Sequence, residues 1–311
     1  MTGGPVRTVF LGSGGFAEPS LRRLAALPDV ELVGVVTAPP RPAGRHGSPR
    51  RTPIHDLAEE LGVPIQTPPR LRAPGSVTEL LSLRPDLLVL ADYGQIVPTA
   101  LLGLRYGALN LHPSLLPRHR GASPIPATIL AGDTETGVSL MRMDDGLDTG
   151  PIVAIEPSPL RGDETTPELE ARLAGSAADL LSSTLPGWLA GERVPVPQPS
   201  EGATQTRPLH RSDGRLDPTR SAIALERQVR ALQPWPGSYV ETPLGRLIVW
   251  AATPESDPAA PGPGLFDRRG LGVASGERLA LVEVQPAGGT RMPWDAFMRG
   301  RPSIVGASIV S

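Results

Sequence analysis

Residues 6–38, VRTVFLGSGGFAEPSLRRLAALPDVELVGVVTA, decide the fold that this sequence predicts. "VRTVFLGS" and "VELVGVVTA" are short apolar runs next to glycine or proline, as expected for strands buried on both faces. Between them, "PSLRRLAAL" has its leucines at helical spacing. A strand, a helix and a second strand in succession predict parallel strands joined by a crossover helix, and therefore an α/β domain.

The same alternation continues along the first 190 residues. Further strands are predicted at 86–92, 107–112, 136–143 and 150–157. Helices are predicted at 54–62, 124–133 and 166–191, the last being either one helix interrupted at Pro186 or a helix pair. We therefore expect a mostly parallel sheet with crossover helices in a domain that spans residues 1–190.

The amino-acid composition changes after residue 190. Residues 191–208 are proline-rich and polar, which predicts a linker. Residues 209–311 contain one predicted helix, 221–232, and short strands predicted at 237–242, 245–252, 262–267, 270–276 and 278–286. Short strands separated by Gly/Pro turns predict a small β-barrel as the second domain.

Composition excludes several kinds of chemistry. The chain of 311 residues has no cysteine and no lysine, so disulfides, thiolate zinc sites, cysteine nucleophiles and Schiff bases are excluded. The five histidines show no spacing typical of metal ligands, and we expect no metal. The net charge of −2 gives no global positive field. No signal segment and no apolar run of about 18 residues is present, so a cytoplasmic location is expected.

The glycines of "FLGSGGFAEP" (10–19) suggest a dinucleotide site as one possibility. That site also needs a carboxylate at the end of the second strand to hold a ribose, and the second strand ends in "VVTAPP". A tight turn that lets the helix pack on the sheet is the simpler interpretation. A nicotinamide-dependent oxidoreductase is therefore disfavoured.

The stretch "NLHPSLLPRHRGASPI" (110–125) carries the candidate chemistry. If 107–112 is a strand, Asn110 and His112 point to the same face, although such a pair can also be purely structural. The loop "MRMDDGLDTGPI" (141–152) can return a carboxylate to the end of a neighbouring strand. An amide, an imidazole and a carboxylate, with no covalent nucleophile, suit direct attack of an amine on a carbonyl-like carbon. In such a reaction the amide and the imidazole donate to the developing oxyanion, and the carboxylate orients the imidazole and helps to move protons.

These two segments resemble the formyltransferases that use 10-formyltetrahydrofolate. The resemblance implies a Rossmann-like, mostly parallel sheet followed by a small OB-like β-barrel. It also implies that the catalytic residues are Asn110, His112 and Asp148. The residues implied to bind folate lie in "ADYGQIVP" and in the turn after His112: Tyr93, Gly94, Gln95, Ile96, Val97, Ser114, Leu115, Leu116 and Pro117.

A third segment, "TAPPRPAGRHGSPRRTPIHDLA" (37–58), resembles the loop with which some members contact the tRNA acceptor end. It implies tRNA-binding residues Arg41, Arg45, Arg50 and Arg51, the last two standing in for lysines that the family commonly has. "RQVRALQPWPGSYVET" (227–242) resembles the segment that opens the family's C-terminal barrel, where we expect Trp235 to be a packing anchor.

The implied reaction transfers the formyl group of 10-formyltetrahydrofolate to the α-amine of initiator methionyl-tRNA. Folate is then a consumed co-substrate rather than a tightly bound cofactor, and the family precedent is a monomer with no membrane contact. The sequence leaves two rival functions open. One is a sister formyltransferase that acts on an amino-sugar nucleotide or a small amine, and the second is a non-catalytic RNA-binding protein that uses the barrel alone.

Overall fold

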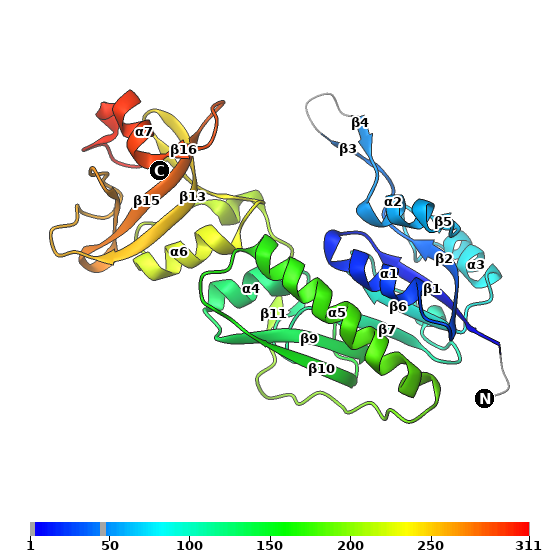
Figure 1. Ribbon diagram of the computed structural model, residues 1–311. Coiled ribbons are helices and arrows are strands. Elements are labelled where there is room, and N and C mark those ends of the chain that lie inside the picture. The colour runs from blue at the N-terminus through cyan, green and yellow to red at the C-terminus, as the bar shows by residue number, and fades with distance from the viewer. Residues whose placement is uncertain (1–3, 44–47, 311) are drawn as a thin grey trace. The chain divides into compact units, whose positions relative to one another are not determined.

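The computed structural model describes residues 4–43 and 48–310 (Figure 1). The described chain forms two compact units. The first runs to Pro124 and also contains Glu135–Pro159 and Glu170–Arg207, and the second contains Ile125–Thr134, Leu160–Leu169 and the chain from Pro208. The chain thus passes between the units more than once, and the domain boundaries drawn at 190 and 208 stay a prediction.

The first unit is built on a seven-stranded sheet in the order β10-β9-β7-β6-β1-β2-β5. Strands β5, β2, β1, β6 and β7 are parallel, and β9 and β10 join antiparallel at one edge. The predicted α/β class with a mostly parallel sheet is confirmed. The strands are β1 (Val6–Gly12), β2 (Val30–Val36), β5 (Ile65–Gln66), β6 (Leu87–Ala91), β7 (Ala108–His112), β9 (Glu135–Arg142) and β10 (Ile152–Pro159).

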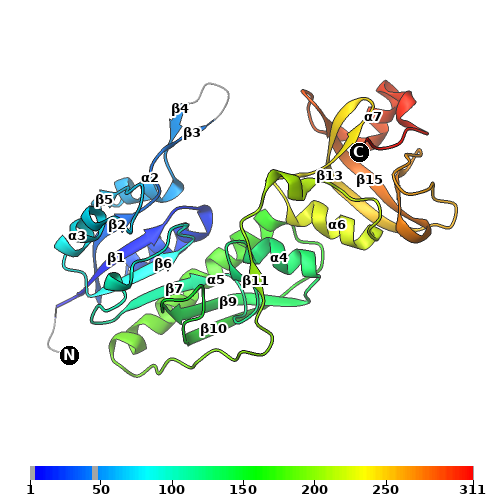
Figure 2. The same ribbon diagram turned by 180° about the vertical axis from the view of Figure 1, so that it is seen from behind.

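Helices cover both faces of this sheet (Figures 1 and 2). Helices α1 (Glu18–Ala25) and α5 (Thr166–Leu189) lie on one face, where Arg23 pairs with Asp179 at 2.8 Å. On the other face, the α3 segment (Pro74–Ser82) and the chain before and after it contribute leucines to a core with β1 and β6: Val9, Leu11, Leu88, Leu90, Leu71, Leu80 and Leu101. Helix α2 (Pro53–Glu60) is preceded by the N-cap residue Thr52, whose side-chain oxygen accepts a hydrogen bond from the backbone N–H of His55.

Helix α5 resolves the choice left open for residues 166–191. It is a single helix that continues through Pro186, which lies in its last turn. A proline there removes only one intrahelical hydrogen bond near the end of the helix. Trp188 then donates from Nε1 to the carbonyl oxygen of Tyr106 at 3.1 Å, which ties the end of α5 to the residues before β7.

The second unit contains an antiparallel sheet, β12-β13-β15-β14, with β16 paired to β15. Apolar side chains of α6, α7 and the sheet share one core, which includes Leu225, Val249 and Phe297. Its elements are α4 (Pro124–Ala131), α6 (Ala222–Ala231), β12 (Ser238–Thr242), β13 (Gly245–Ser256), β14 (Gly270–Val273), β15 (Glu277–Pro286), β16 (Met292–Pro293) and α7 (Trp294–Gly300).

Two expectations for this unit are wrong. Residues 262–267 form no strand and make only isolated bridges at Leu265 and Phe266, because glycine and proline interrupt the segment. Trp235 is 52% exposed and therefore is not a packing anchor. The buried aromatic residues at this end of the chain are instead Phe266, Trp294 and Phe297, whose rings stack on one another.

Several short elements complete the chain. The pair β3 (Arg41–Ala43) and β4 (Ser48–Arg50) forms an antiparallel ribbon after β2. The pair β8 (Arg120–Gly121) and β11 (Gln205–Thr206) is parallel and ties part of the predicted linker to the segment after β7. The 3₁₀ helices are Gly15–Ala17, Thr99–Leu101, Arg211–Gly214, Ala274–Gly276 and Pro302–Ile304.

Candidate active site

Strand β7 places Asn110 and His112 on one face of the sheet, as the alternation of side chains predicts. Asn110 is the register partner of Leu90 in β6, and Leu90 belongs to the core that α3 covers. His112 is opposite Ser139 of β9 and is only 4% exposed. The Asn110 side chain is half-buried and makes no hydrogen bond with any described residue, so its amide is available to a ligand.

Asp148 lies against His112. The Asp148 Oδ2 atom is 3.7 Å from Nδ1 of His112, which is an electrostatic contact rather than a hydrogen bond. The same Oδ2 accepts a hydrogen bond from the backbone N–H of Gly121 at 2.7 Å. The structure therefore brings together the imidazole and the carboxylate that were predicted to act together.

The other ring nitrogen of His112 is already engaged. Nε2 lies 2.9 Å from the carbonyl oxygen of His119. A carbonyl oxygen can only accept, so Nε2 carries the hydrogen, and in the neutral ring Nδ1 presents its lone pair toward Asp148. Burial lowers the pKa of His112, although the Asp148 charge and the His119 carbonyl each act to raise it. The imidazole is therefore neutral at pH 7.

Backbone strain is concentrated in the loops around His112. Four described residues other than glycine have a positive φ, and three of them are Asp92, His119 and Asp148, with φ of 48°, 56° and 52°. Such conformations cost energy for an L-residue, and aspartate tolerates them better than most residue types. Two of these residues contact His112, His119 through its carbonyl oxygen and Asp148 through its carboxylate.

The turn Ser114–Pro117, predicted to bind folate, is fixed to β9. Ser139 donates from Oγ to the carbonyl oxygen of Ser114 at 2.7 Å and accepts from the N–H of Leu116 at 3.1 Å. The hydroxyl of Ser114 is used within the turn, because it donates to the carbonyl oxygen of Arg118 at 2.6 Å. Leu115 and Pro117 are the partly exposed members of this turn.

The second predicted folate segment, Tyr93–Val97, follows β6 and thus leaves the same edge of the sheet as the turn after β7. Tyr93 and Val97 pack on the core, whereas Gly94 and Ile96 are exposed. The Tyr93 hydroxyl is buried with no partner among the described residues, and burial raises its pKa to about 12. An unpaired buried hydroxyl is costly, and a ligand that pairs with it would remove that cost.

The glycine loop after β1 does not form a phosphate site. A Cβ added at Gly14 would lie 1.8 Å from Oδ2 of Asp92, so the carboxylate occupies the space that this glycine leaves. Asp92 has an exposed surface, but much of its carboxylate is surrounded by protein. This loss of solvation, and to a smaller extent the negative charge of Glu170, raise the pKa of Asp92 to about 6. Two carboxylates beside this loop oppose a pyrophosphate, which supports the exclusion of a dinucleotide site.

A residue that the sequence did not indicate holds the Asp148 loop. Gln198 donates from Nε2 to the carbonyl oxygens of Asp148 and Gly150, both at 2.8 Å. Its Oε1 accepts from Nε and Nη2 of Arg120 at 3.1 and 2.6 Å. Thr204 accepts from the N–H of His119 at 2.8 Å, so the segment predicted as a linker supports the site from behind.

Strands β3 and β4 carry Arg41 and Arg50, two of the arginines predicted to contact tRNA, and Arg51 follows β4 directly. Arg41 and Arg50 are exposed and form no ion pair with a described residue, whereas Arg51 pairs with Glu59 at 2.6 Å. Arg45 lies outside the described residues. The ribbon follows β2, and β1 and β6 separate β2 from β7, so the axes of β2 and β7 are three strand spacings, roughly 14 Å, apart.

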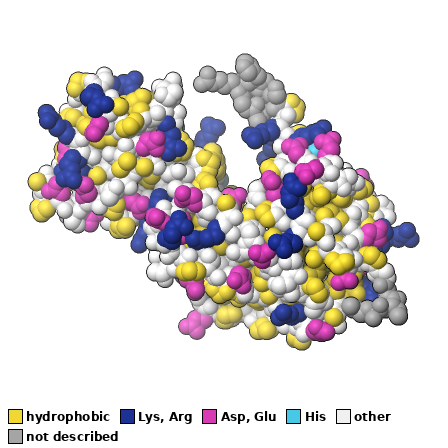
Figure 3. Space-filling model, in the orientation of Figure 1, with side chains coloured by type: hydrophobic (Ala, Val, Ile, Leu, Met, Phe, Trp, Pro, Cys, Tyr) yellow, Lys and Arg dark blue, Asp and Glu magenta, His cyan; other side chains and the backbone are white. Residues whose placement is uncertain are grey.

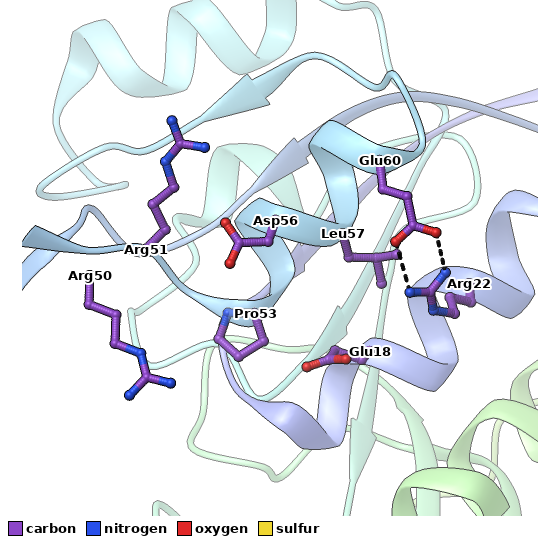
Figure 4. Close-up of a pocket in the computed structure, with 8 residues that line it drawn as sticks. All are labelled: Glu18, Arg22, Arg50, Arg51, Pro53, Asp56, Leu57 and Glu60. Atoms are coloured by element: carbon purple, nitrogen blue, oxygen red, sulfur yellow. Dashed lines mark hydrogen bonds and ion pairs between the residues drawn. The ribbon is translucent and has the colours of Figure 1, made fainter.

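A depression of ≈ 330 Å³ opens at the base of this ribbon (Figure 4). Figure 4 shows Arg50 and Arg51 directed to different sides, and Arg22 paired with Glu60. Arginine and acidic side chains are intermixed over the face drawn in Figure 3, so charge does not mark out a single basic patch there. The lining residues are Glu18, Arg22, Arg50, Arg51, Pro53, Asp56, Leu57 and Glu60.

The described part of the chain offers neither a metal-binding cluster nor a membrane span. No three His, Cys, Asp or Glu side chains in residues 4–43 and 48–310 are grouped so that they could hold a metal ion. Within the same ranges, every helix is too short or too polar to cross a bilayer.

Comparison with known proteins identifies the family to which the chain is similar. The formyl transferase family model matches residues 6–185, and the model of the formyl transferase C-terminal domain matches residues 208–302. The methionyl-tRNA formyltransferase of Myxococcus xanthus is 43% identical over 94% of this chain and 95% of its own length. That of Gluconacetobacter diazotrophicus is 44% identical over 98% of this chain and 100% of its own.

Solved structures share the fold at lower identity. An N-formyltransferase from Helicobacter canadensis, in complex with folinic acid and dTDP-3-aminofucose, matches with a TM-score of 0.66 at 14% identity, over 89% of this chain and 99% of its own. HypX from Aquifex aeolicus, in complex with tetrahydrofolic acid, matches with a TM-score of 0.62 at 18% identity, over 94% of this chain and 46% of its own.

Proposed function

This chain belongs to the formyl transferase family, and we propose that it transfers the formyl group of 10-formyltetrahydrofolate to the α-amine of initiator methionyl-tRNA. The observation that carries the chemistry is the placement of His112 against Asp148, with the free carboxamide of Asn110 two residues away on the same face. The acceptor is inferred from the relatives: this chain matches methionyl-tRNA formyltransferases over nearly their full length.

In the proposed reaction the amine attacks the formyl carbon directly. An α-amino group has a pKa of roughly 8, so a usable fraction is unprotonated at neutral pH. The new C–N bond forms as the carbonyl oxygen takes negative charge. The intermediate then collapses, the bond from the formyl carbon to N10 of the folate breaks, the attacking amine loses a proton, and N10 gains one.

Asn110 is the proposed donor to the oxyanion. Its carboxamide has N–H groups that no described residue uses, and it lies at the edge where both proposed folate segments begin. A fixed donor aimed at the developing charge needs no reorganisation during the reaction.

His112 and Asp148 are proposed to manage the proton. Because Nε2–H is bonded to His119, the lone pair at Nδ1 is the ring's free proton acceptor, and Asp148 stabilises the imidazolium once a proton arrives. Donation from His112 to the oxyanion, which the sequence suggested, would require the substrate oxygen to replace the His119 carbonyl at Nε2.

The substrates are assigned to the remaining predicted residues. We propose that Tyr93–Val97 and Ser114–Pro117 hold the folate, with the unpaired hydroxyl of Tyr93 as one polar contact. We also propose that Arg41, Arg45, Arg50 and Arg51 contact the tRNA. Arg51 is the weakest of the described candidates, because Glu59 already neutralises it.

The deciding experiment is an assay of the purified chain with 10-formyltetrahydrofolate. Formylation of methionyl-tRNA, with none of uncharged tRNA and none of a nucleotide-linked amino sugar, is the expected result. Formylation of the amino sugar but not of methionyl-tRNA would replace the proposal with the sister activity. Binding of tRNA without any transfer would favour a non-catalytic RNA-binding protein.

Three further expectations accompany this proposal, on location, oligomeric state and domain boundaries. The proposed substrate, methionyl-tRNA, is used in translation, which supports a cytoplasmic location, to be checked by cell fractionation. We propose a monomer, to be checked by light scattering of the purified chain. The division at residues 190 and 208 is proposed as well, and limited proteolysis of the full chain would test whether cleavage is confined to residues 191–208.

A further inference from the structure

We propose that Arg70 and Arg72 form a subsite for the carboxylates of the formyl donor's glutamyl tail, so that donors with several γ-linked glutamates bind more tightly. This inference rests on the proposed function, since it assumes that the Tyr93–Val97 loop holds the folate. It adds a part of the donor that none of the predicted folate residues accounts for.

The subsite is a depression of ≈ 240 Å³ lined by Arg70, Arg72, Gln95 and Ile96. Leu71 is fully buried in the core, so its two neighbours are exposed on the outside. The Gln95 side chain joins the two walls, because Oε1 accepts from the N–H of Leu71 at 2.7 Å and Nε2 donates to the carbonyl oxygen of Pro68 at 3.0 Å. The arginines are thus attached to the proposed folate loop itself.

The two guanidinium groups are available to an anion. Neither Arg70 nor Arg72 forms an ion pair or a side-chain hydrogen bond with any described residue. By contrast, Arg7, Arg22 and Arg23 of the same unit all pair with carboxylates. A guanidinium group binds a carboxylate through two parallel hydrogen bonds, and two such groups at one depression favour a ligand with several carboxylates.

The apolar part of the depression fits the same ligand. Ile96 is 73% exposed, although it is a large apolar side chain beside two cations. In the donor, an aromatic ring connects the pterin to the first glutamate, and each added γ-linked glutamate brings one more carboxylate. A ring on Ile96 and carboxylates on Arg70 and Arg72 would follow the chemical order of the donor outward from the Tyr93–Val97 loop.

The test uses 5-formyltetrahydrofolate, which does not react, with one or with five glutamates. Wild-type protein is expected to bind the pentaglutamate about five- to tenfold more tightly at low salt, the effect of one or two exposed ion pairs. In the R70A/R72A variant the two dissociation constants should become nearly equal. Raising the salt concentration should reduce the wild-type preference, because exposed pairs are screened.

Arg193→Ala is the matched control. Arg193 is exposed and follows α5. Trp188 ties the end of α5 to Tyr106, just before β7, whereas the proposed folate loop follows the carboxyl end of β6, at the other end of the parallel strands. This variant should keep the pentaglutamate preference.

An equal preference in wild type and R70A/R72A, or no preference in wild type, would overturn the subsite. A higher KM for methionyl-tRNA in R70A/R72A, with the donor preference unchanged, would also overturn it and would assign the arginines to phosphate. Failure of the proposed function looks different, since wild type would then formylate no methionyl-tRNA with either the monoglutamate or the pentaglutamate form of the donor.

Discussion

Asn110 combines a position on a central strand with a side chain that no described residue engages. Replacing it with alanine should lower kcat about 10²–10³-fold with little change in either KM, because the lost hydrogen bond forms only with the developing oxyanion. Steady-state kinetics of Asn110→Ala and of the isosteric Asn110→Asp, which lacks the N–H donors, would measure this. If both variants fold and keep full turnover, Asn110 has no catalytic role.

The contact between His112 and Asp148 predicts a direction for the pKa of His112. The Asp148 charge acts to raise that pKa against burial, so Asp148→Asn should lower it further. Asparagine can still accept from the Gly121 N–H, which preserves the local hydrogen bond. NMR titration of the His112 ring would measure the shift, with His112→Asn used for assignment. An unchanged or higher pKa in Asp148→Asn would contradict the proposed interaction.

Asp92 makes the protein less stable at neutral pH. Its pKa is raised from 3.8 to about 6, so the folded state holds a proton that the unfolded state has released. Stability is therefore lost as pH rises from about 4 to about 6 and remains lost above that range. Asp92→Asn should raise Tm at pH 7.5 by about 2–4 °C, corresponding to about 1 kcal/mol once exposure to solvent is allowed for.

Calorimetry at two pH values would check this prediction. At pH 4.5 wild-type Asp92 is protonated in the folded state, so Asp92→Asn should gain much less there. Asparagine can still accept the hydrogen bond that Gly14 makes to Asp92. An equal gain at both pH values would show that charge is not the cause.

Among the elements, the predicted linker, residues 191–208, differs most from its prediction, because Gln198 and Thr204 in it bond to residues of the candidate site. Gln198→Ala removes two bonds to the Asp148 loop and two to Arg120, each worth about 1 kcal/mol net. We expect kcat to fall about tenfold while both KM values stay nearly constant. Kinetics and the NMR pKa of His112 would test this together, since displacement of Asp148 should lower that pKa.

Gln205→Ala provides the matched control for that prediction. Gln205 lies in the same segment, is exposed and makes no side-chain hydrogen bond with a described residue. It should behave like wild type. A fall in Tm for Gln198→Ala with unchanged kcat and His112 pKa would mean that Gln198 only stabilises the fold.

The sequence predicts those elements whose pattern is local. The period of two in a strand was enough to place Asn110 and His112 on one face, and apolar runs marked β1, β2 and β6. Gln198 could not be found in this way, because it lies in a proline-rich stretch and bonds to residues about 50 positions away. The contact of Asp148 with His112 and its φ of +52° are likewise not visible in a pattern of aspartates and glycines.

Trp235 is a residue for which the local pattern predicted burial wrongly. A tryptophan between two prolines suggested burial, yet the core of the second unit is filled by Phe266, Trp294 and Phe297. Which of several aromatic residues enters a core depends on the spatial arrangement of the strands, and local composition does not determine that arrangement.

At the scale of the whole molecule, charge limits how a polyanion can be bound. The net charge is −2, and all 30 of the Lys and Arg residues are arginine. No long-range positive field attracts tRNA, so affinity must come from a few guanidinium groups close to the phosphates. Arg41 and Arg50 are the proposed candidates for these contacts, because they are exposed and no described carboxylate neutralises them.

The absence of lysine makes this dependence testable on the intact protein. Reductive methylation can modify only the α-amine, and the KM for methionyl-tRNA should stay unchanged. Phenylglyoxal, which modifies exposed guanidinium groups, should raise that KM at least tenfold, and bound tRNA should slow the inactivation. The buried Arg278 is only 3% exposed and is therefore shielded from the reagent, so the fold should survive the modification. Circular dichroism would confirm that the modified protein is folded. Unaltered tRNA binding after extensive arginine modification would show that phosphate recognition does not depend on guanidinium groups.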